Sequence, residues 1–189
     1  MPTISRLYDN YADAAATVNA LEEANAGKND ISIIANADAR GRSTDPDSRA
    51  AEPETKTGAG TGAGIGAALG GGIGLLAGIG TLAIPGIGPL VAAGWLATTL
   101  AGAAVGAGAG GIVGALTGAG VSREEANVYE EGIRRGGSLV TVRADEDERQ
   151  RIEAIMDVRH PRHWQDHAEE YRASGWDYPQ DAQDTSLRR

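Results

Sequence analysis

Hydrophobic and polar positions near the start of the chain change from a two-residue period to a helical one. Residues 3–8 alternate, which predicts a short strand. Asn10 then caps a helix over residues 11–25, and an apolar run over 30–35 predicts a second, more buried strand. Residues 1–36 are therefore expected to form a strand–helix–strand unit. The core face of its helix is Ala14, Val18 and Leu21.

A similar order of patterns returns over residues 121–167. Ser122 and Glu125 form a capping box, which predicts a helix over residues 122–136 that stops at two glycines. The β-branched run 139–143 predicts a strand after it. The buried face of the helix is expected to be Ala126, Tyr129 and Ile133.

Another helix is expected directly after this strand. Asp145 caps it, and it must end before Pro161, because the residue before a proline is pushed out of the helical region. Residues 163–166 are predicted to form a last short strand, and residues 168–189 a C-terminal tail that begins with a helical turn. The apolar face of the helix is Ile152, Ile155 and Met156.

The two halves together predict an α+β fold. Two strand–helix–strand units make a small ferredoxin-like plait, with helices on one face of an antiparallel sheet. A three-stranded variant without the weak last strand is the alternative. Residues 37–57 contain two prolines, nine charges and no large apolar residue, so a flexible polar linker is expected there. The region 58–120 is then an insertion into the plait.

The glycine-rich region has a regular pattern. Residues 57–122 carry no charged side chain and hold 22 of the 28 glycines. Residues four apart lie on one face of a helix, so glycines at that spacing form stripes without side chains, which allow helices to pack closely. These predicted helix-packing glycines are Gly58, Gly62, Gly66, Gly70, Gly74 and Gly78 in one register, and Gly94, Gly102, Gly106, Gly110, Gly114 and Gly118 in the other.

A glycine-zipper helical hairpin is the structure that this pattern predicts. Its arms are expected over about 58–83 and 90–119, and the two prolines and two glycines of residues 84–89 make the turn. Each arm exceeds the roughly 20 residues that a membrane crossing needs. The alternatives are a soluble oligomer, in which hairpins from several copies bury the stripes against one another, and a disordered segment.

The charges around the hairpin predict its orientation in a bilayer. Basic residues flank both ends and the turn is uncharged, which places both termini on the cytoplasmic side of a membrane. Trp95 lies near the turn, where an interfacial indole is expected. The expected partners are the lipid bilayer and further copies of the chain, and the alternative location is the cytoplasm. The flanking basic residues are Arg40, Arg42, Arg49 and Lys56 before the hairpin, and Arg123, Arg134 and Arg135 after it.

Composition excludes several classes of protein. The chain has 189 residues, no cysteine and a net charge of −9. Without cysteine it has no disulfide scaffold, thiol nucleophile or cysteine-type zinc site. The acidic balance argues against nucleic-acid binding, which needs a basic surface. The N-terminus lacks a basic segment followed by an apolar run, so no cleaved signal is expected.

Few residues suggest chemistry, and the chain is expected to be a non-enzyme without catalytic residues, cofactor, metal or small-molecule substrate. Residues 106–111 match G-x-G-x-x-G, but no strand leads into them. The acidic run 145–148 is typical of the first turn of a helix. Arg134 and Arg135 are expected either to touch anionic lipid heads or to form a solvated helix end. His160, His163 and His167 could hold a metal at their spacing, but a solvated tail is favoured.

Three stretches resemble a known bacterial family. They are MPTISRLYDNYADAAATVNALEEA at the start, EEANVYEEGIRRGGSLVTVRAD after the glycine-rich region, and YRASGW near the end. With the glycine-rich segment, they are similar to the heat-induced stress protein YflT (general stress protein 17M-like) family, in its long form with a hydrophobic insert. The resemblance implies a stress-associated bacterial protein without catalytic residues. The expected function is a cytoplasmic α/β domain tethered to the bacterial inner membrane by a self-associating hairpin. The alternative is a soluble oligomeric module that binds a ligand or a protein.

Overall fold

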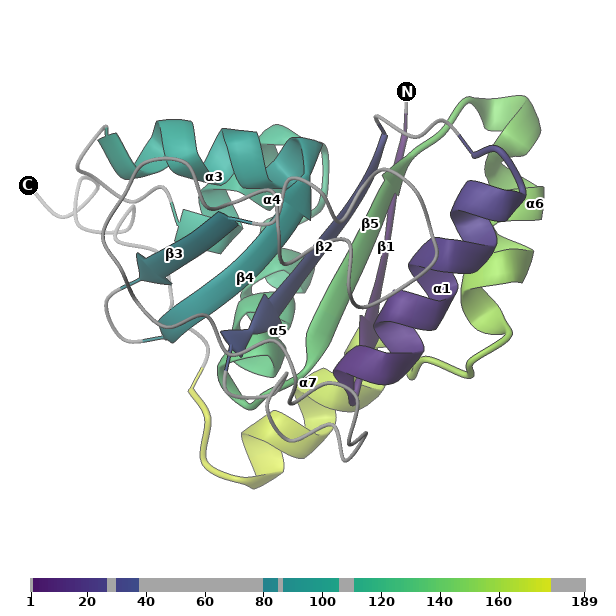
Figure 1. Cartoon of the computed structure of the whole chain (residues 1–189). Coiled ribbons are helices and arrows are strands. Elements are labelled where there is room, and N and C mark those ends of the chain that lie inside the picture. The colour runs from purple at the N-terminus through teal and green to yellow at the C-terminus, as the bar shows by residue number, and fades with distance from the viewer. Residues whose placement is uncertain (1, 27–29, 38–79, 85–86, 106–110, 178–189) are drawn as a thin grey trace, which may run out of the picture.

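The computed structural model describes residues 2–26, 30–37, 80–84, 87–105 and 111–177. These residues form one five-stranded sheet, in which every neighbouring pair of strands is antiparallel (Figure 1). Helices cover both faces of the sheet. The predicted α+β class is confirmed, whereas the prediction that helices cover only one face is wrong.

The N-terminal strand–helix–strand prediction is confirmed. The elements are β1 (Thr3–Tyr8), α1 (Tyr11–Glu23) and β2 (Ile31–Asn36). Asn10 caps α1, because its side-chain oxygen accepts a hydrogen bond from the Asp13 N–H at 2.8 Å. The predicted core face of Ala14, Val18 and Leu21 is buried.

The middle of the glycine-rich region departs from the predicted helical hairpin. The structure has two strands there, β3 (Gly80–Ile84) and β4 (Gly88–Gly94), and then two helices, α3 (Trp95–Val105) and α4 (Gly111–Gly118). A turn does join the arms at the predicted place, but it joins strands. A single helix over 90–119 is therefore wrong, and residues 58–79 of the first predicted arm lie outside the described residues.

The strand β4 is fixed by its contact with β2. Leu90–Ala93 is an apolar run that lies between the two glycine registers and belongs to neither. Gly94 has φ +89°, and a Cβ there would overlap the carbonyl oxygen of Ile31. Gly94 thus lets β4 approach β2 and then turn into α3, so it does not serve as a helix-packing glycine.

The helix and strand predicted after the glycine-rich region are confirmed as α5 (Arg123–Arg134) and β5 (Ser138–Arg143). Ser122 caps α5 by accepting a hydrogen bond from the Glu125 N–H at 3.2 Å. The Glu125 carboxylate does not complete the predicted capping box. It accepts a hydrogen bond from the Tyr129 hydroxyl at 2.6 Å.

The last two described helices are α6 (Glu146–Asp157) and α7 (Trp164–Ala173). α6 begins after Asp145 and ends before Pro161 as predicted, although the Asp145 side chain makes no capping hydrogen bond. The strand predicted over 163–166 is wrong, because His163 is the N-cap of α7. Residues one helical turn apart, including His167 and Tyr171, bury one face of α7, which favours the helix.

The strands have the spatial order β1-β5-β2-β4-β3. β5 lies between β1 and β2, so the unit β1–α1–β2 is split by an antiparallel strand. The predicted plait has a fourth strand beside β1, but the described part of the chain has none in that place. It carries the β3–β4 hairpin beyond β2 instead.

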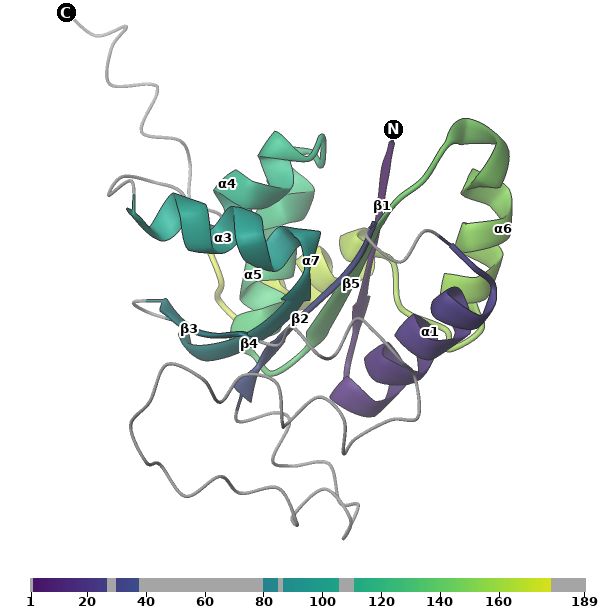
Figure 2. The same ribbon diagram turned by 45° about the horizontal axis from the view of Figure 1, so that its top comes forward.

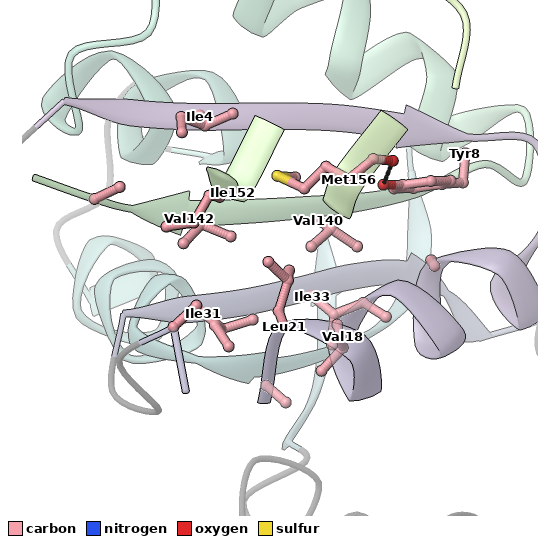
Figure 3. Close-up of a cluster of buried hydrophobic side chains, with 14 residues drawn as sticks. Ile4, Tyr8, Val18, Leu21, Ile31, Ile33, Val140, Val142, Ile152 and Met156 are labelled. Atoms are coloured by element: carbon pink, nitrogen blue, oxygen red, sulfur yellow. Dashed lines mark hydrogen bonds between the residues drawn. The ribbon is translucent and has the colours of Figure 1, made fainter. Parts of the chain in front are cut away.

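The sheet separates two layers of helices (Figure 2), and a hydrophobic core lies between each layer and the sheet. α1 and α6 cover one face, where Leu21, Ile33, Val140 and Met156 pack together (Figure 3). The Tyr8 hydroxyl closes the end of this core by donating a hydrogen bond to the Met156 carbonyl oxygen at 2.8 Å. α3, α4 and α5 cover the other face, with Leu90, Leu96, Leu116, Ile133 and Leu139 among its buried residues.

The described residues do not contain the long apolar helices of the predicted membrane hairpin. Among the residues that the structure describes, no helix has the length and hydrophobicity of a membrane span. Trp95, predicted to lie at a bilayer interface, is tied to the domain. Its indole N–H donates to the Asp30 carbonyl oxygen at 2.9 Å, and the Arg143 guanidinium lies 4.5 Å from the indole centroid.

Candidate functional site

A polar pocket lies at the end of β1, between α5 and α7. Its volume is about 130 Å³. Residues far apart in the sequence meet there because α7 packs against α5. The pocket is lined by Leu7, Tyr8, Asp9, Gly132, Gly137, Arg135, Arg162, Glu170 and Tyr171.

Arg162 holds two carboxylates at the rim of this pocket. Its Nη1 donates to Glu170 Oε2 at 2.6 Å, whereas its Nη2 reaches Asp9 Oδ1 only at 3.4 Å. The hydrogen bond from Arg162 holds the pKa of the Glu170 carboxyl below its usual value. The contact with Asp9 is long for a charge-assisted hydrogen bond, so it is the weaker of the two.

Arg135 comes from the opposite side, at the C-terminus of α5. Its Nε donates to Glu131 at 2.6 Å and its Nη2 to the Ser174 hydroxyl at 2.8 Å. The guanidinium lies 4.3 Å from the centroid of the Tyr171 ring, in a cation–π contact. These three contacts fix the guanidinium plane against the pocket wall.

Arg134 and Arg135 were predicted either to touch lipid heads or to form a solvated helix end, and in the structure both contact a carboxylate of their own helix. Both guanidiniums pair with the carboxylate of Glu131, which is only 4% exposed. Burial alone would raise the pKa of Glu131, but the hydrogen bonds from the two arginines outweigh it and lower that pKa. The two arginines therefore neutralise a buried acid of their own helix.

Two glycines make the wall between β1 and α5. A Cβ at Gly132 would overlap Leu7 Cδ2, and it would stand 3.1 Å from the Tyr171 hydroxyl. A Cβ at Gly137 would stand 2.9 Å from the Gly132 carbonyl oxygen. Larger residues at either position would push into the pocket wall, so glycine is needed for the close approach.

His167 lies behind the pocket on the inner face of α7. It is 1% exposed, which contradicts the predicted solvated tail. Its Nδ1 lies 3.4 Å from the Tyr171 hydroxyl, and its Nε2 is buried without a hydrogen-bond partner. Burial lowers the pKa of His167 and raises that of Tyr171 to about 12, so both side chains are neutral near pH 7.

The three histidines do not meet. His163 caps α7, His160 takes a left-handed backbone with φ 49°, and only His167 is buried. No group of three metal-ligating side chains gathers in the described ranges. The acidic run 145–148 forms the start of α6, as predicted. Residues 106–110 of the G-x-G-x-x-G match lie outside the described residues.

The predicted helix-packing glycines are only partly described. Gly58, Gly62, Gly66, Gly70, Gly74, Gly78, Gly106 and Gly110 lie outside the described residues. Gly102 lies in α3, and Gly114 and Gly118 lie in α4. A Cβ at Gly118 would meet nothing within 4 Å, so close helix packing does not depend on that position. The buried face of α4 is Ile112, Ala115 and Leu116.

The two edges of the sheet differ. At the β1 edge, the carbonyl oxygen of Ser5 accepts a hydrogen bond from Arg6 Nη1 at 3.0 Å and lies 3.1 Å from the Tyr129 hydroxyl. Ser5 and Leu7 are both buried there. β3 forms the other edge and pairs only with β4 among the strands that the structure describes. Side chains thus cover the β1 edge, whereas no described strand covers β3.

Comparisons of the chain with protein-family models, with curated proteins and with solved structures found no match. The pocket was missed by reasoning from sequence, because Arg162, Glu170 and Tyr171 belong to a segment expected to be strand and tail. The apolar and small residues at helical spacing in 164–171 were the signal that could have revealed α7 and its buried face.

Proposed function

We propose that this protein is a non-enzymatic, stress-associated bacterial module that self-associates through the edge strand β3. The observation that carries the proposal is that β3 pairs on one side only within the described part of the chain. An edge strand presents a row of N–H and C=O groups that can pair with another strand. A second copy supplies an identical strand, which can pair in the antiparallel direction about a two-fold axis.

The sequence around β3 supports self-association. Monomeric proteins protect such edges with charged residues, prolines or bulges. Residues 57–122 carry no charge, and the two prolines near β3 stand at 85 and 89, beyond its C-terminal end. β3 thus lacks a charged side chain that would repel a second copy. The opposite edge, at β1, has the Arg6 and Tyr129 side chains over Ser5.

The core of the module derives from a plait. β1, α1 and β2 with the inserted β5 have the order of the first three strands of a ferredoxin-like sheet. The fourth strand was expected in the segment that forms α7. The β3–β4 hairpin extends the sheet beyond β2. In this proposal, the glycine-rich region supplies the edge strand β3, through which copies of the chain bind one another.

A non-catalytic role is consistent with the two carboxylates that pair most closely with the arginines of the pocket. A general base needs a pKa near the working pH. Arg162 lowers the pKa of Glu170, and the two arginines of α5 lower that of Glu131. Both groups are therefore weak bases that act as charge partners of arginine.

The test is the oligomeric state of the full chain. We expect light scattering after size exclusion to give a dimer or a larger species at micromolar concentration. Thr81→Lys or Ala83→Lys places a charge on β3 and should shift the protein to monomer. Ala154→Lys adds the same charge to an exposed position of α6 and should leave the oligomer intact. A monomeric wild type, or oligomers that all three variants retain, would refute the proposal.

Membrane contact is a second candidate, favoured by the uncharged residues 57–79. The chain leaves β2 at residue 36 and returns at β3, and both strands belong to one sheet. Such a segment has to enter and leave a bilayer on the same side. Two crossings need about 40 apolar residues, and the uncharged stretch before β3 has 23. The candidate is therefore a shallow contact, and failure of the full chain to sediment with lipid vesicles would exclude it.

A further inference from the structure

We propose that the pocket between α5 and α7 binds one small oxyanion group, a carboxylate or a phosphate, between Arg135 and Arg162. The site lies at the β1 end of the sheet order, away from the β3 edge. Its evidence is independent of self-association. The occupant is identified by the donors that the pocket offers, by the weak contact that it can replace, and by the pocket's size.

The two guanidiniums offer donors that the fold leaves unused. Arg135 donates through Nε and Nη2, and Arg162 through Nη1 and Nη2. Nη1 of Arg135 and Nε of Arg162 have no protein acceptor in the described ranges. Planar guanidiniums with free N–H groups are the usual partners of carboxylate and phosphate oxygens. Two of them line one pocket together with the Asp9 and Glu170 carboxylates, so a negatively charged occupant has to bind through the unused donors and in place of Asp9.

A contact within the site can be exchanged for the ligand. Asp9 Oδ1 lies 3.4 Å from Arg162 Nη2, and the Asp9 side chain is 70% exposed. An incoming oxyanion can take this donor at a shorter distance, while Asp9 turns to solvent at little cost. Glu170, at 2.6 Å, stays on Nη1 and keeps the guanidinium in place. Asp9 is thus a competitor of the ligand, and Glu170 a positioning residue.

The pocket also has room for a small ligand. An apolar cavity of about 150 Å³ holds a ligand the size of benzene, with six heavy atoms. The pocket here has about 130 Å³ and is open to solvent on one side, so phosphate, acetate or a short hydroxy acid fits inside it. Gly132 and Gly137 keep that volume open. The Tyr171 hydroxyl has only the 3.4 Å contact with His167, so it can donate to the anion as a third group.

Titrations with inorganic phosphate and with acetate test this site on the full chain. We expect saturable shifts of the backbone amide NMR signals around residues 132–137 and 162–171, at constant ionic strength set by chloride. Arg162→Gln should weaken binding about tenfold or more, since it removes the charge and the donors. Asp9→Asn should strengthen binding several-fold, because it removes the competing carboxylate. The tighter of the two probes names the ligand class.

Two controls separate binding from general electrostatics. Arg149→Gln removes a charge from an exposed ion pair on α6 and should leave the affinity unchanged. Methylammonium chloride, a cation of similar size, should give no saturable shift. The proposal is overturned if phosphate and acetate both fail to saturate, or if Arg162→Gln binds as the wild type does. It is also overturned if Asp9→Asn binds more weakly than the wild type while its thermal melt is unchanged.

Discussion

Mild acid should destabilise this protein through His167. The imidazole is buried in the folded chain, and burial lowers its pKa below the ordinary value of 6.5. The unfolded chain returns to that ordinary value and takes up the proton first. Stability is therefore fully present above about pH 6.5 and is lost as the pH falls toward the lowered folded pKa.

The size of the effect follows from proton linkage. At pH 5.5 an imidazole with a pKa of 6.5 is protonated about ten to one, which stabilises the unfolded chain by up to about 1.4 kcal/mol. The charged groups around the imidazole ring shift the pKa of His167 in both directions. Arg162 lowers the pKa of His167 further, whereas Asp9, Asp166 and Glu170 raise it. The stated loss is thus an upper limit.

Urea unfolding at pH 7.5 and pH 5.5 measures this loss. Wild type should lose up to about 1.4 kcal/mol between the two pH values. His167→Leu should be nearly flat over this range, and at pH 7.5 it should be as stable as wild type or up to about 1 kcal/mol more stable, because the unpartnered Nε2 is gone. His163→Gln, at the N-cap of α7, should keep the wild-type slope. Equal slopes for wild type and His167→Leu would refute the argument.

Three further substitutions test the fold by urea unfolding at pH 7.5. Gly94→Ala should cost about 2–5 kcal/mol, because it combines a left-handed backbone with an overlap against Ile31; an effect below 1 kcal/mol would contradict the close approach of β4 to β2. Tyr8→Phe should cost about 1 kcal/mol, since it removes the 2.8 Å hydrogen bond to the Met156 carbonyl oxygen. Ser122→Ala should cost about 1 kcal/mol as a lost helix cap, and Ser122→Asp should restore most of it.

Sequence patterns predicted correctly those helices and strands that depend on contacts between residues close together in the chain. Asn10 and Ser122 mark the starts of α1 and α5 because their side chains cap N–H groups only three residues away. The run 139–143 was predicted correctly as a strand, because it is rich in the β-branched and apolar residues that strands favour. These elements make up the β1-β5-β2 part of the sheet.

The strand β4 could not be predicted in the same way. Leu90–Ala93 is equally suited to a helix, and what selects the strand is pairing with β2, about 60 residues earlier. The Ser32 hydroxyl donates to the Ala93 carbonyl oxygen at 2.8 Å across this pair. A contact between such distant residues leaves no periodic signal in a single sequence.

The replacement of the expected last strand by α7 connects the fold with the pocket. A strand over 163–166 beside β1 would be short and extended, and nothing would carry Glu170 and Tyr171 back to α5. As a helix, α7 packs on α5 and places Arg162, Glu170 and Tyr171 around the end of β1. The pocket therefore depends on the β1 end of the sheet, where the described residues hold a helix in place of the predicted fourth strand.

The two proposed interactions involve opposite edges of the same sheet, so they can be separated by substitution. β1 and β3 have three strands between them. Arg162→Gln changes a rim side chain at the β1 end and should leave self-association intact, whereas Thr81→Lys changes the β3 edge and should leave anion binding intact. Loss of both properties in either variant, with an unchanged thermal melt, would mean that the pocket is completed by a second copy. The same experiments would then locate the pocket at the interface between copies.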